Sequence, residues 1–445
     1  MATTLKNRDL EQESLRLSTL DVRDIWVGFW REHFAFWMIC GYLFVEYVRP
    51  QSILPQIDVL PWGKLFLALA IIGAVLDRSV RWVSDPNNGL ISLFLAGIVV
   101  SISVANYPAE ASEHFMDFFG WFVIYFVCIN IVNTQLRFLI FLFIFLLASF
   151  KISTGLAAVF ASRGFAFTDW GLSGPPGFFE NSGELAIQML VFWPIAFYLA
   201  ISLKKHLSWW KQLVLWSMPI TAITTVIGSS SRGGQLALAV QIVFMLAIGK
   251  VRFSRIAIVV CLLYAGYLAI PEEGRERIDR AGSDTTSQQR LVYWTRGIEM
   301  IQDYPWFGVG YFNFEHYFQD YYTRDLLVRQ AQMPHNIFIQ IGTDGGIVLF
   351  TIYAALIIQA FRTTSQVRKV LPPGSEDRFI SPDLTRGFDV GFVGFLVAGQ
   401  FVTVAYYPFM WIHLVFVTSL RNIATKSMAT VKPPLPSMPH RSHST

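Results

Sequence analysis

The sequence is poor in charged residues, which make up only 15% of its 445 positions. Soluble globular domains carry about 25% charged residues, and disordered chains combine high charge with low hydrophobicity. With 53% hydrophobic residues, 39 Phe, 14 Trp and a mean hydropathy of +0.45, the chain fits neither class. The net charge of +4 is small and scattered, so we expect no nucleic-acid partner.

Cysteine is also scarce. Cys40, Cys128 and Cys261 lie far apart, each within an apolar run. This spacing indicates neither a disulfide framework nor a metal site. A cleavable signal peptide is not expected, because the first 30 residues are polar, alternate in charge and lack a small-residue cleavage site.

Long apolar runs dominate the rest of the chain. Crossing a bilayer takes roughly 20 mostly apolar residues, and by this criterion we expect about twelve transmembrane helices. Lys151 interrupts the least certain stretch. The sequence therefore predicts an all-α, polytopic integral membrane helical bundle. The predicted spans begin near Phe34, Trp62, Leu90, Phe115, Leu136, Glu184, Leu213, Gln235, Ile256, His335, Phe388 and Tyr407.

Basic residues gather on alternate connections, for example at 204–211 and 250–255. Basic short loops stay on the cytoplasmic side, so both termini should be cytoplasmic. The expected organisation has a cytoplasmic arm, nine spans, one large periplasmic loop, three spans and a cytoplasmic tail. In residue numbers these are 1–32, 33–270, 271–334, 335–425 and 426–445.

The large loop contains a predicted helix at 287–301. Residues 285–287 (Thr-Thr-Ser) supply N-cap candidates. An apolar face follows from the spacing of Leu291, Trp294, Ile298 and Ile301. Such a helix lies on the bilayer, lies on the bundle, or simply packs inside the loop.

Three motifs on the expected periplasmic side have residues suited to chemistry. In residues 229–235, serines and glycines surround Arg232 directly before a predicted span. This pattern suits an anion-binding site at a helix start. The alternative is an arginine whose side chain snorkels to the membrane interface. Arg290 and Trp294 are four residues apart and share a helical face. In a functional role, Trp294 would stack on a sugar ring and Arg290 would bind a phosphate with two N–H groups. The alternative is that Arg290 is solvated and Trp294 anchors the helix.

His335 belongs to the third motif, residues 333–346. Pro334 suits a first helical turn, which places His335 at the mouth of a membrane helix. The positive helix end favours the neutral imidazole, which is the form that acts as a general base. The alternative is a passive hydrogen-bonding histidine at the interface.

A glycine-rich stretch at 174–186 enters another span. Glu180 and Glu184 are spaced to share a helical face and to orient an arginine or a substrate hydroxyl. Capping and turn formation is the alternative role for these residues. A metal site would need more carboxylates or histidines at set spacing.

At these residues the sequence resembles the O-antigen ligase and O-antigen polymerase superfamily of bacterial membrane glycosyltransferases. The similarity covers about residues 220–360 and keeps the family order of motifs. Tyr304 stands where many members have histidine, and Asp344 where many have glutamate. The matching stretches are 231–233 (Ser-Arg-Gly), Arg290 with Trp294, 304–314, 334–336 (Pro-His-Asn) and 344–346 (Asp-Gly-Gly).

The resemblance implies a GT-C-like enzyme of the bacterial inner membrane without cofactor or metal. It would transfer a glycan, with inversion, from undecaprenyl diphosphate to a sugar hydroxyl of lipid A–core or of a growing polysaccharide. Arg232 and Arg290 would neutralise the leaving diphosphate, and His335 would take the acceptor proton or orient the donor. Substrate contacts are expected from Trp294, Asn336, Glu180, Glu184, Tyr321 and Tyr322.

Within this class the single large loop favours a ligase over a polymerase, since polymerases tend to carry two sizeable external loops. The alternative from another class is a transporter or flippase for lipid-linked glycans. Transporters place ionisable residues near the membrane midplane, where Glu46 and Asp117 are among the few candidates.

Overall fold

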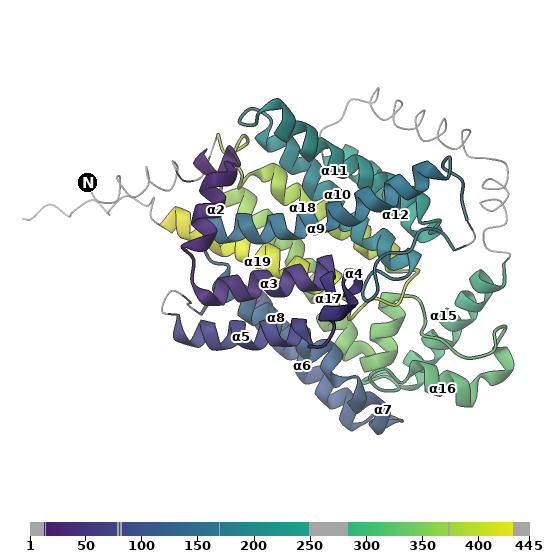
Figure 1. Cartoon of the computed structure of the whole chain (residues 1–445). Coiled ribbons are helices and arrows are strands. Elements are labelled where there is room, and N and C mark those ends of the chain that lie inside the picture. The colour runs from purple at the N-terminus through teal and green to yellow at the C-terminus, as the bar shows by residue number, and fades with distance from the viewer. Residues whose placement is uncertain are drawn as a thin grey trace, which may run out of the picture.

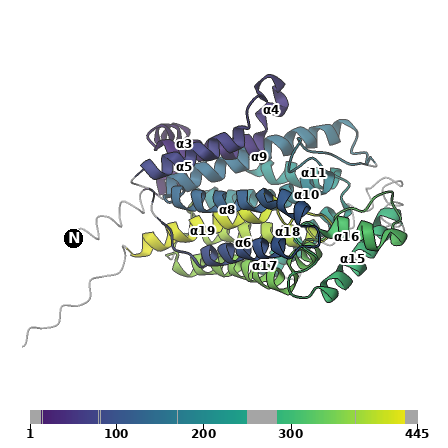
Figure 2. The same cartoon turned by 90° about the horizontal axis from the view of Figure 1, so that it is seen from below.

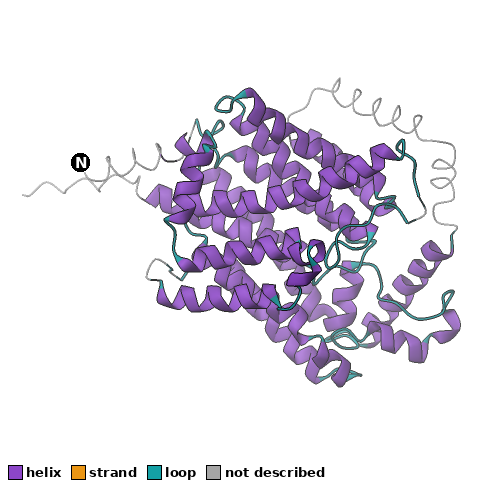
Figure 3. Cartoon of the chain, in the orientation of Figure 1, coloured by secondary structure: helices purple, strands orange, loops and turns teal. Residues whose placement is uncertain are grey.

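The computed structural model describes residue 13 and residues 15–429, except 78–79, 81, 169, 249–283 and 373. Every regular element in this part of the chain is helical (Figure 3), which confirms the all-α prediction for it. The helices, labelled as in Figure 1, are α2 (Val22–Trp30), α3 (Phe34–Val48), α4 (Pro50–Ile53), η1 (Pro55–Ile57), α5 (Trp62–Leu76), α6 (Pro86–Ser103), α7 (Pro108–Glu113), α8 (Phe115–Ile131), α9 (Gln135–Ser162), α10 (Ser182–Leu203), α11 (Trp209–Gly228), α12 (Arg232–Ile248), α15 (Thr285–Asp303), α16 (Phe314–Tyr321), η2 (Thr323–Asp325), α17 (Ile337–Val370), α18 (Pro382–Ala398) and α19 (Pro408–Ala429).

Several helices have the length and composition of membrane spans, which supports a membrane helical bundle. Five are long and apolar enough to cross a bilayer, and three shorter ones are similarly apolar. The number of twelve spans stays a prediction, and the span expected near Ile256 lies outside the described residues. The five are Pro86–Ser103, Pro108–Ile131, Gln135–Ser162, Ser182–Leu203 and Ile337–Val370, and the shorter three are Phe34–Val48, Trp62–Leu76 and Arg232–Ile248.

Helix starts follow local capping chemistry. α3, α5 and α8 begin at the predicted residues, whereas α6 begins before Leu90, at Pro86. Asp85 is the reason, because its side chain accepts the Asn87 N–H at 2.9 Å and the proline suits a first helical position. α9 continues through Lys151, whose side chain is exposed and leaves the helix uninterrupted.

The interior of the bundle depends on close contact between α10 and α18. A Cβ atom at Gly387 would lie 3.0 Å from the Pro194 carbonyl oxygen, and one at Gly391 would lie 2.8 Å from that of Val191. The two glycines are four residues apart, so they lie on one face of α18, and the α10 backbone packs against this face. Small faces of this kind replace the hydrophobic driving force that is missing between helices in lipid.

The two ends of the bundle differ. α2 and the last turns of α19 lie at one end, and α15 and α16 lie together at the opposite end (Figures 1 and 2). The prediction that both termini lie on the same side of the membrane requires α2 and the last turns of α19 to lie at the same end of the bundle, as they do. Which side that is stays a prediction.

α17 is broken at Gly345 and Gly346, where the backbone leaves helical geometry. The segment 304–314 docks at the break. The Ile347 N–H donates to the Pro305 carbonyl at 2.8 Å, and the Val309 N–H donates to the Thr343 carbonyl at 2.9 Å. A break in a helix of membrane length is tolerated where other protein groups satisfy the freed backbone, and this segment does so.

α15 and α16 enclose a small core of their own, which includes Tyr293, Met300, Phe314 and Phe318. The helix predicted at 287–301 is confirmed, although it is longer and its N-cap is Asp284 rather than residues 285–287.

The predicted apolar face of α15 is only partly covered by protein. Leu291 and Ile298 are 55% and 50% exposed, whereas Gln289, Tyr293 and Gly297 are buried. Apolar spacing alone does not separate a face toward protein from a face toward lipid or solvent.

Gly346→Ala should destabilise the protein, because φ 58° and ψ −155° are accessible almost only to glycine and an added Cβ would lie 2.5 Å from the Trp306 carbonyl carbon. The backbone strain alone costs about 1–3 kcal/mol, so the melting temperature of the detergent-purified protein should fall. Gly120→Ala, in the middle of α8 with open space around it, is the control. Equal melting temperatures of the two variants would contradict this role for Gly346.

Candidate active site

One cavity contains both arginines singled out from the sequence. Its volume is about 660 Å³, and it lies between the starts of α10 and α12, the first half of α15 and the loop at 401–402. The mixture of guanidinium, hydroxyl, carboxylate and aromatic groups suits a charged, sugar-containing ligand. Its lining includes Arg232, Asp284, Ser287, Arg290, Trp294 and Phe401.

Arg232 is the first residue of α12, directly after the serine turn. The Ser231 hydroxyl accepts the Gly234 N–H at 3.2 Å and so caps the helix. Arg232 Nη1 donates to Asp284 Oδ2 at 2.6 Å and to Ser287 Oγ at 3.4 Å. A cation at a helix start is unfavourable for the helix dipole, and the Asp284 carboxylate offsets this.

Arg290 and Trp294 lie one turn apart on α15, and both side chains line the cavity. Arg290 Nε is buried and has no hydrogen-bond partner within the described structure. Burial lowers the pKa of Arg290, which the nearby Asp284 carboxylate opposes, and an arginine keeps its proton in proteins. Arg290 lines the cavity, and no ion pair to it is found among the described residues, so its charge is available to an anionic ligand.

His335 borders this cavity without lining it. The prediction that Pro334 lies in the first helical turn is wrong, because α17 begins at Ile337. His335 instead adopts a left-handed backbone, with φ 50°, and Asn336 is the N-cap. The Asn336 side-chain oxygen accepts two first-turn N–H groups at 2.9 and 3.2 Å, so its acceptor capacity is used for capping.

The surroundings of His335 keep its imidazole neutral. Burial, and then the Arg290 charge, lower the pKa of His335 to about 4. Its backbone N–H donates to Thr403 Oγ1 at 3.0 Å, and the Trp294 indole N–H donates to the Pro334 carbonyl at 3.0 Å. These two bonds fix the histidine backbone between α15 and the loop that continues the cavity wall.

The glutamates proposed as substrate contacts lie outside the cavity lining. Glu184 is buried, and its carboxylate accepts the Asn181 backbone and side-chain N–H groups at 3.2 Å each, as well as the Tyr407 hydroxyl. Glu180 is exposed. The contacts of Glu184 thus belong to the start of α10.

Tyr321 and Tyr322 also lie outside this lining, at the end of α16. The Tyr321 ring stacks on Tyr317 with centroids 4.4 Å apart, and the Tyr322 ring lies 5.0 Å from the Arg296 guanidinium.

The sequence reasoning missed Asp284, which lines the cavity, and Thr403, which accepts the His335 N–H. A signal for Asp284 exists, since Asp before a Thr-Thr-Ser run at a helix start is a strong N-cap pattern. Thr403 carries no such signal, because its role depends on a contact with His335, which is distant in the sequence.

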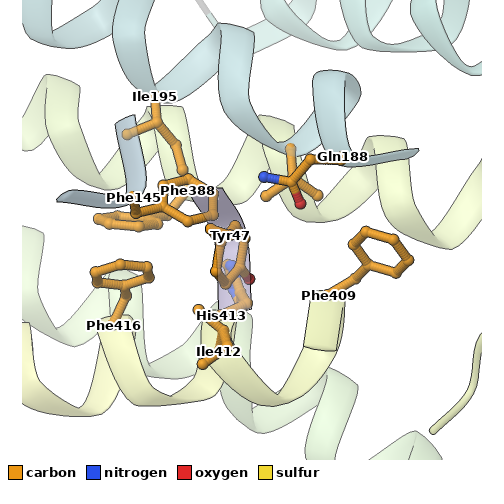
Figure 4. A pocket seen from close by; sticks show the side chains of 10 residues that line it. Tyr47, Phe145, Gln188, Ile195, Phe388, Phe409, Ile412, His413 and Phe416 are labelled. Carbon is orange, nitrogen blue, oxygen red and sulfur yellow. The ribbon is translucent and has the colours of Figure 1, made fainter. Parts of the chain in front are cut away.

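Two further cavities are less suited to this chemistry. The one in Figure 4, lined by Tyr47, Gln188 and His413 among others, has a volume of only about 10 Å³, room for at most one water. A groove of about 620 Å³ among α5, α6 and α8 includes Asp85, whose carboxylate is paired with Arg421 at 2.7 Å. Among the described residues, no group of three or more His, Cys, Asp or Glu is arranged to hold a metal ion.

Two family models match the chain. Residues 218–354 match the O-antigen ligase family, and residues 22–204 match a family of unknown function (DUF5935). A comparison with curated proteins finds no match. The resemblance to the O-antigen ligase and polymerase superfamily, read from the motifs, is confirmed by the match over residues 218–354. The match supports a glycosyltransferase of this general kind.

Arg290→Met should raise the pKa of His335 from about 4 toward the ordinary value of 6.5, because it removes a nearby positive charge. The shift should be partial, since burial remains. The pH dependence of His335 carbethoxylation, a reaction of the neutral imidazole followed by peptide mass spectrometry, measures it. Arg296→Met on the same helix, whose guanidinium is paired with Glu299 and Asp325, should leave the midpoint unchanged. An unshifted midpoint in Arg290→Met would disprove the coupling.

Proposed function

We propose that the protein transfers a glycan from undecaprenyl diphosphate to a sugar hydroxyl of an acceptor on the periplasmic face, by inversion and without a metal. The observation that carries the proposal is the position of Arg232 and Arg290. They come from separate elements, α12 and α15, and line the same cavity. Two fixed guanidinium groups in one cavity suit a diphosphate, which each can grip with two N–H groups.

The proposed reaction forms one bond and breaks another. The acceptor oxygen attacks the anomeric carbon of the donor sugar from the face opposite the diphosphate. The bond from that carbon to the phosphate oxygen breaks, and the diphosphate leaves with the bonding electrons. Arg232 and Arg290 stabilise the charge that develops on it, and Trp294 supplies a ring for stacking on the sugar.

His335 receives the acceptor proton in this scheme. A pKa of about 4 keeps the imidazole free to accept a proton at neutral pH, but it also makes a weak base. The bound diphosphate would counter the Arg290 charge and raise the pKa of His335. The base would therefore strengthen when the donor is in place.

We favour a ligase, with lipid A–core as acceptor, over an O-antigen or exopolysaccharide polymerase. The support is the single large loop of the sequence, whose described part folds as α15 and α16 at one end of the bundle. A flippase for lipid-linked glycans is the second candidate, because it would use the same charged cavity.

Glycan transfer by the purified protein in detergent tests the proposal. Detergent removes the two compartments that transport requires, so transfer there can come only from an enzyme. Product formation from an undecaprenyl-diphosphate glycan and a lipid A–core acceptor is the expected result. Product that instead contains lengthened lipid-linked glycan would identify a polymerase, and binding without transfer would favour the flippase.

Arg232→Lys and Arg290→Lys should each lose most transfer activity, although the charge is kept. Lysine lacks the planar two-pronged grip on phosphate oxygens, and loss of such a transition-state contact costs on the order of 10²–10³ in rate. Initial rates at saturating donor measure the effect. Near wild-type rates in both variants would mean that the arginines are interface anchors.

His335→Ala should insert and purify normally but fail to transfer glycan. His335→Gln separates two roles, because glutamine can donate a hydrogen bond to the diphosphate but cannot accept a proton at neutral pH. An inactive Gln variant that still binds the donor would support the base, and an active one would support donor orientation. Activity in both variants would remove His335 from the mechanism.

The periplasmic position of α15 can be tested by cysteine labelling. A cysteine replacing the exposed Gln302 should react with a membrane-impermeant maleimide in intact cells, because the charge pattern of the loops puts it outside. A cysteine replacing Lys205, which has a 63% exposed side chain, should react only after permeabilisation. The reverse pattern would overturn the orientation.

A further inference from the structure

Asp284 links the two arginine-bearing helices. Its Oδ1 accepts the Ser287 backbone N–H at 3.0 Å and caps α15, and its Oδ2 accepts Arg232 Nη1 from the start of α12 at 2.6 Å. The Ser287 hydroxyl donates to Oδ2 at 2.9 Å. Three donors therefore converge on one carboxylate in the cavity wall.

The carboxylate occupies Arg232 Nη1, a donor that a phosphate oxygen could otherwise bind. In the described part of the chain, Nη1 is the only Arg232 nitrogen with a hydrogen-bond partner. Asp284 and Ser287 thus hold one edge of the guanidinium and leave its other donors unpaired. Both partners of the ion pair are about one-third exposed, at 36% for Arg232 and 34% for Asp284, so an incoming anion can reach them.

The charges around the cavity explain why a resident anion is needed there. Arg232, Arg290 and the positive start of α12 all place positive charge in one region, and the pKa of Arg290 is lowered partly by Arg232. Burial alone would raise the pKa of Asp284, but hydrogen bonds from Arg232 and Ser287 hold it well below its usual range. Asp284 therefore stays ionised across the working pH range and is the counter-ion of Arg232 in the cavity wall.

We propose that Asp284 is a positioning residue that aims Arg232 into the cavity and competes with the donor diphosphate for it. This inference rests on the proposed function. Two opposite effects follow. Without the Asp284 charge, the diphosphate binds more tightly, because the competing anion is gone. The transfer step becomes slower, because Arg232 is no longer held in one orientation.

Asp284→Asn is the informative variant. Asparagine is as good an N-cap as aspartate, and its side-chain oxygen can still accept the Ser287 N–H, so α15 keeps its start. The negative charge toward Arg232 is lost, together with the Oδ2 acceptor for Arg232 Nη1 and for the Ser287 hydroxyl. Asp303→Asn is the matched control, because Asp303 is an exposed aspartate at the last residue of the same helix and lies outside the cavity lining.

Two measurements on the full-length protein in detergent test the inference. Inorganic pyrophosphate binding, followed by calorimetry, should tighten about three- to fivefold in Asp284→Asn, the scale of a partly exposed ion pair. With a lipid-linked glycan donor, KM should fall while kcat falls about tenfold, the scale of a misaligned contact. Asp303→Asn should match the wild type in both, and melting temperatures check that the variants are equally folded.

Each contrary result has a distinct meaning. If Asp284→Asn binds pyrophosphate no more tightly than Asp303→Asn, or keeps its kcat, the inference is wrong while the proposed function stands. A purely structural role would lower the melting temperature and the active fraction without lowering KM, and this too would overturn it. If the wild-type protein neither binds pyrophosphate nor transfers glycan, the proposed function itself fails, and the inference fails with it.

Discussion

The hydrogen bonds that Asp344 accepts at the break of α17 fix the parts of the molecule around the candidate site. Its Oδ1 accepts the Phe312 N–H at 3.1 Å, and its Oδ2 accepts the Tyr406 hydroxyl at 2.9 Å. The carboxyl group is fully buried, and a buried polar group is costly unless it is paired. The segments 304–314 and 399–407, which pair it, are therefore both held to α17, and they also contact each other, with the Tyr311 and Tyr406 ring centroids 5.1 Å apart. One of them continues from α15 and the other forms part of the cavity wall.

This junction explains why motifs far apart in the sequence serve a single site. The segment 304–314 has no residue among the lining of the main cavity. Its backbone forms hydrogen bonds with the break in α17. It also follows directly after α15, the helix that carries Arg290 and Trp294, and so fixes the end of that helix. The family-like run around Tyr304 and the Asp-Gly-Gly sequence are thus two halves of one structural contact. This contact is structural, whereas the charged residues of the cavity carry the proposed chemistry.

Much of the fold was predictable from local patterns, and the failures have physical causes. The starts of α3, α5 and α8 follow from the onset of apolar runs. Pro334 misled the prediction for α17, because the left-handed backbone of His335 moves the helix start to Ile337. Proline preference marks a possible first turn but contains no information about the following residue. For α15 the sequence left open whether its apolar face meets lipid or protein, because apolar periodicity is the same toward both.

The residues of the candidate site also divide into those that local patterns predict and those that depend on distant contacts. Arg232, Arg290 and Trp294 were predictable because helix starts and four-residue spacing are local properties, and these three do meet in one cavity. The contacts that position the site were not predictable, since Thr403 meets His335 and Asp284 meets Arg232 from distant segments, although the capping role of Asp284 has a local signal. Glu184 illustrates the converse case, where a local pattern suited two roles and the structure shows the contacts of a helix start.

The cavity has an apolar rim. Leu236 on α12 and Leu291 on α15 both line it and are 50% and 55% exposed. Exposed leucines beside guanidinium groups give the cavity an apolar part next to a charged part. In the proposed function, a donor anchored by a long hydrocarbon chain would reach such an entrance by lateral diffusion, with its tail still in the bilayer and only its head group entering. Access would then depend on the two-dimensional concentration of the donor in the membrane rather than on its solubility in water.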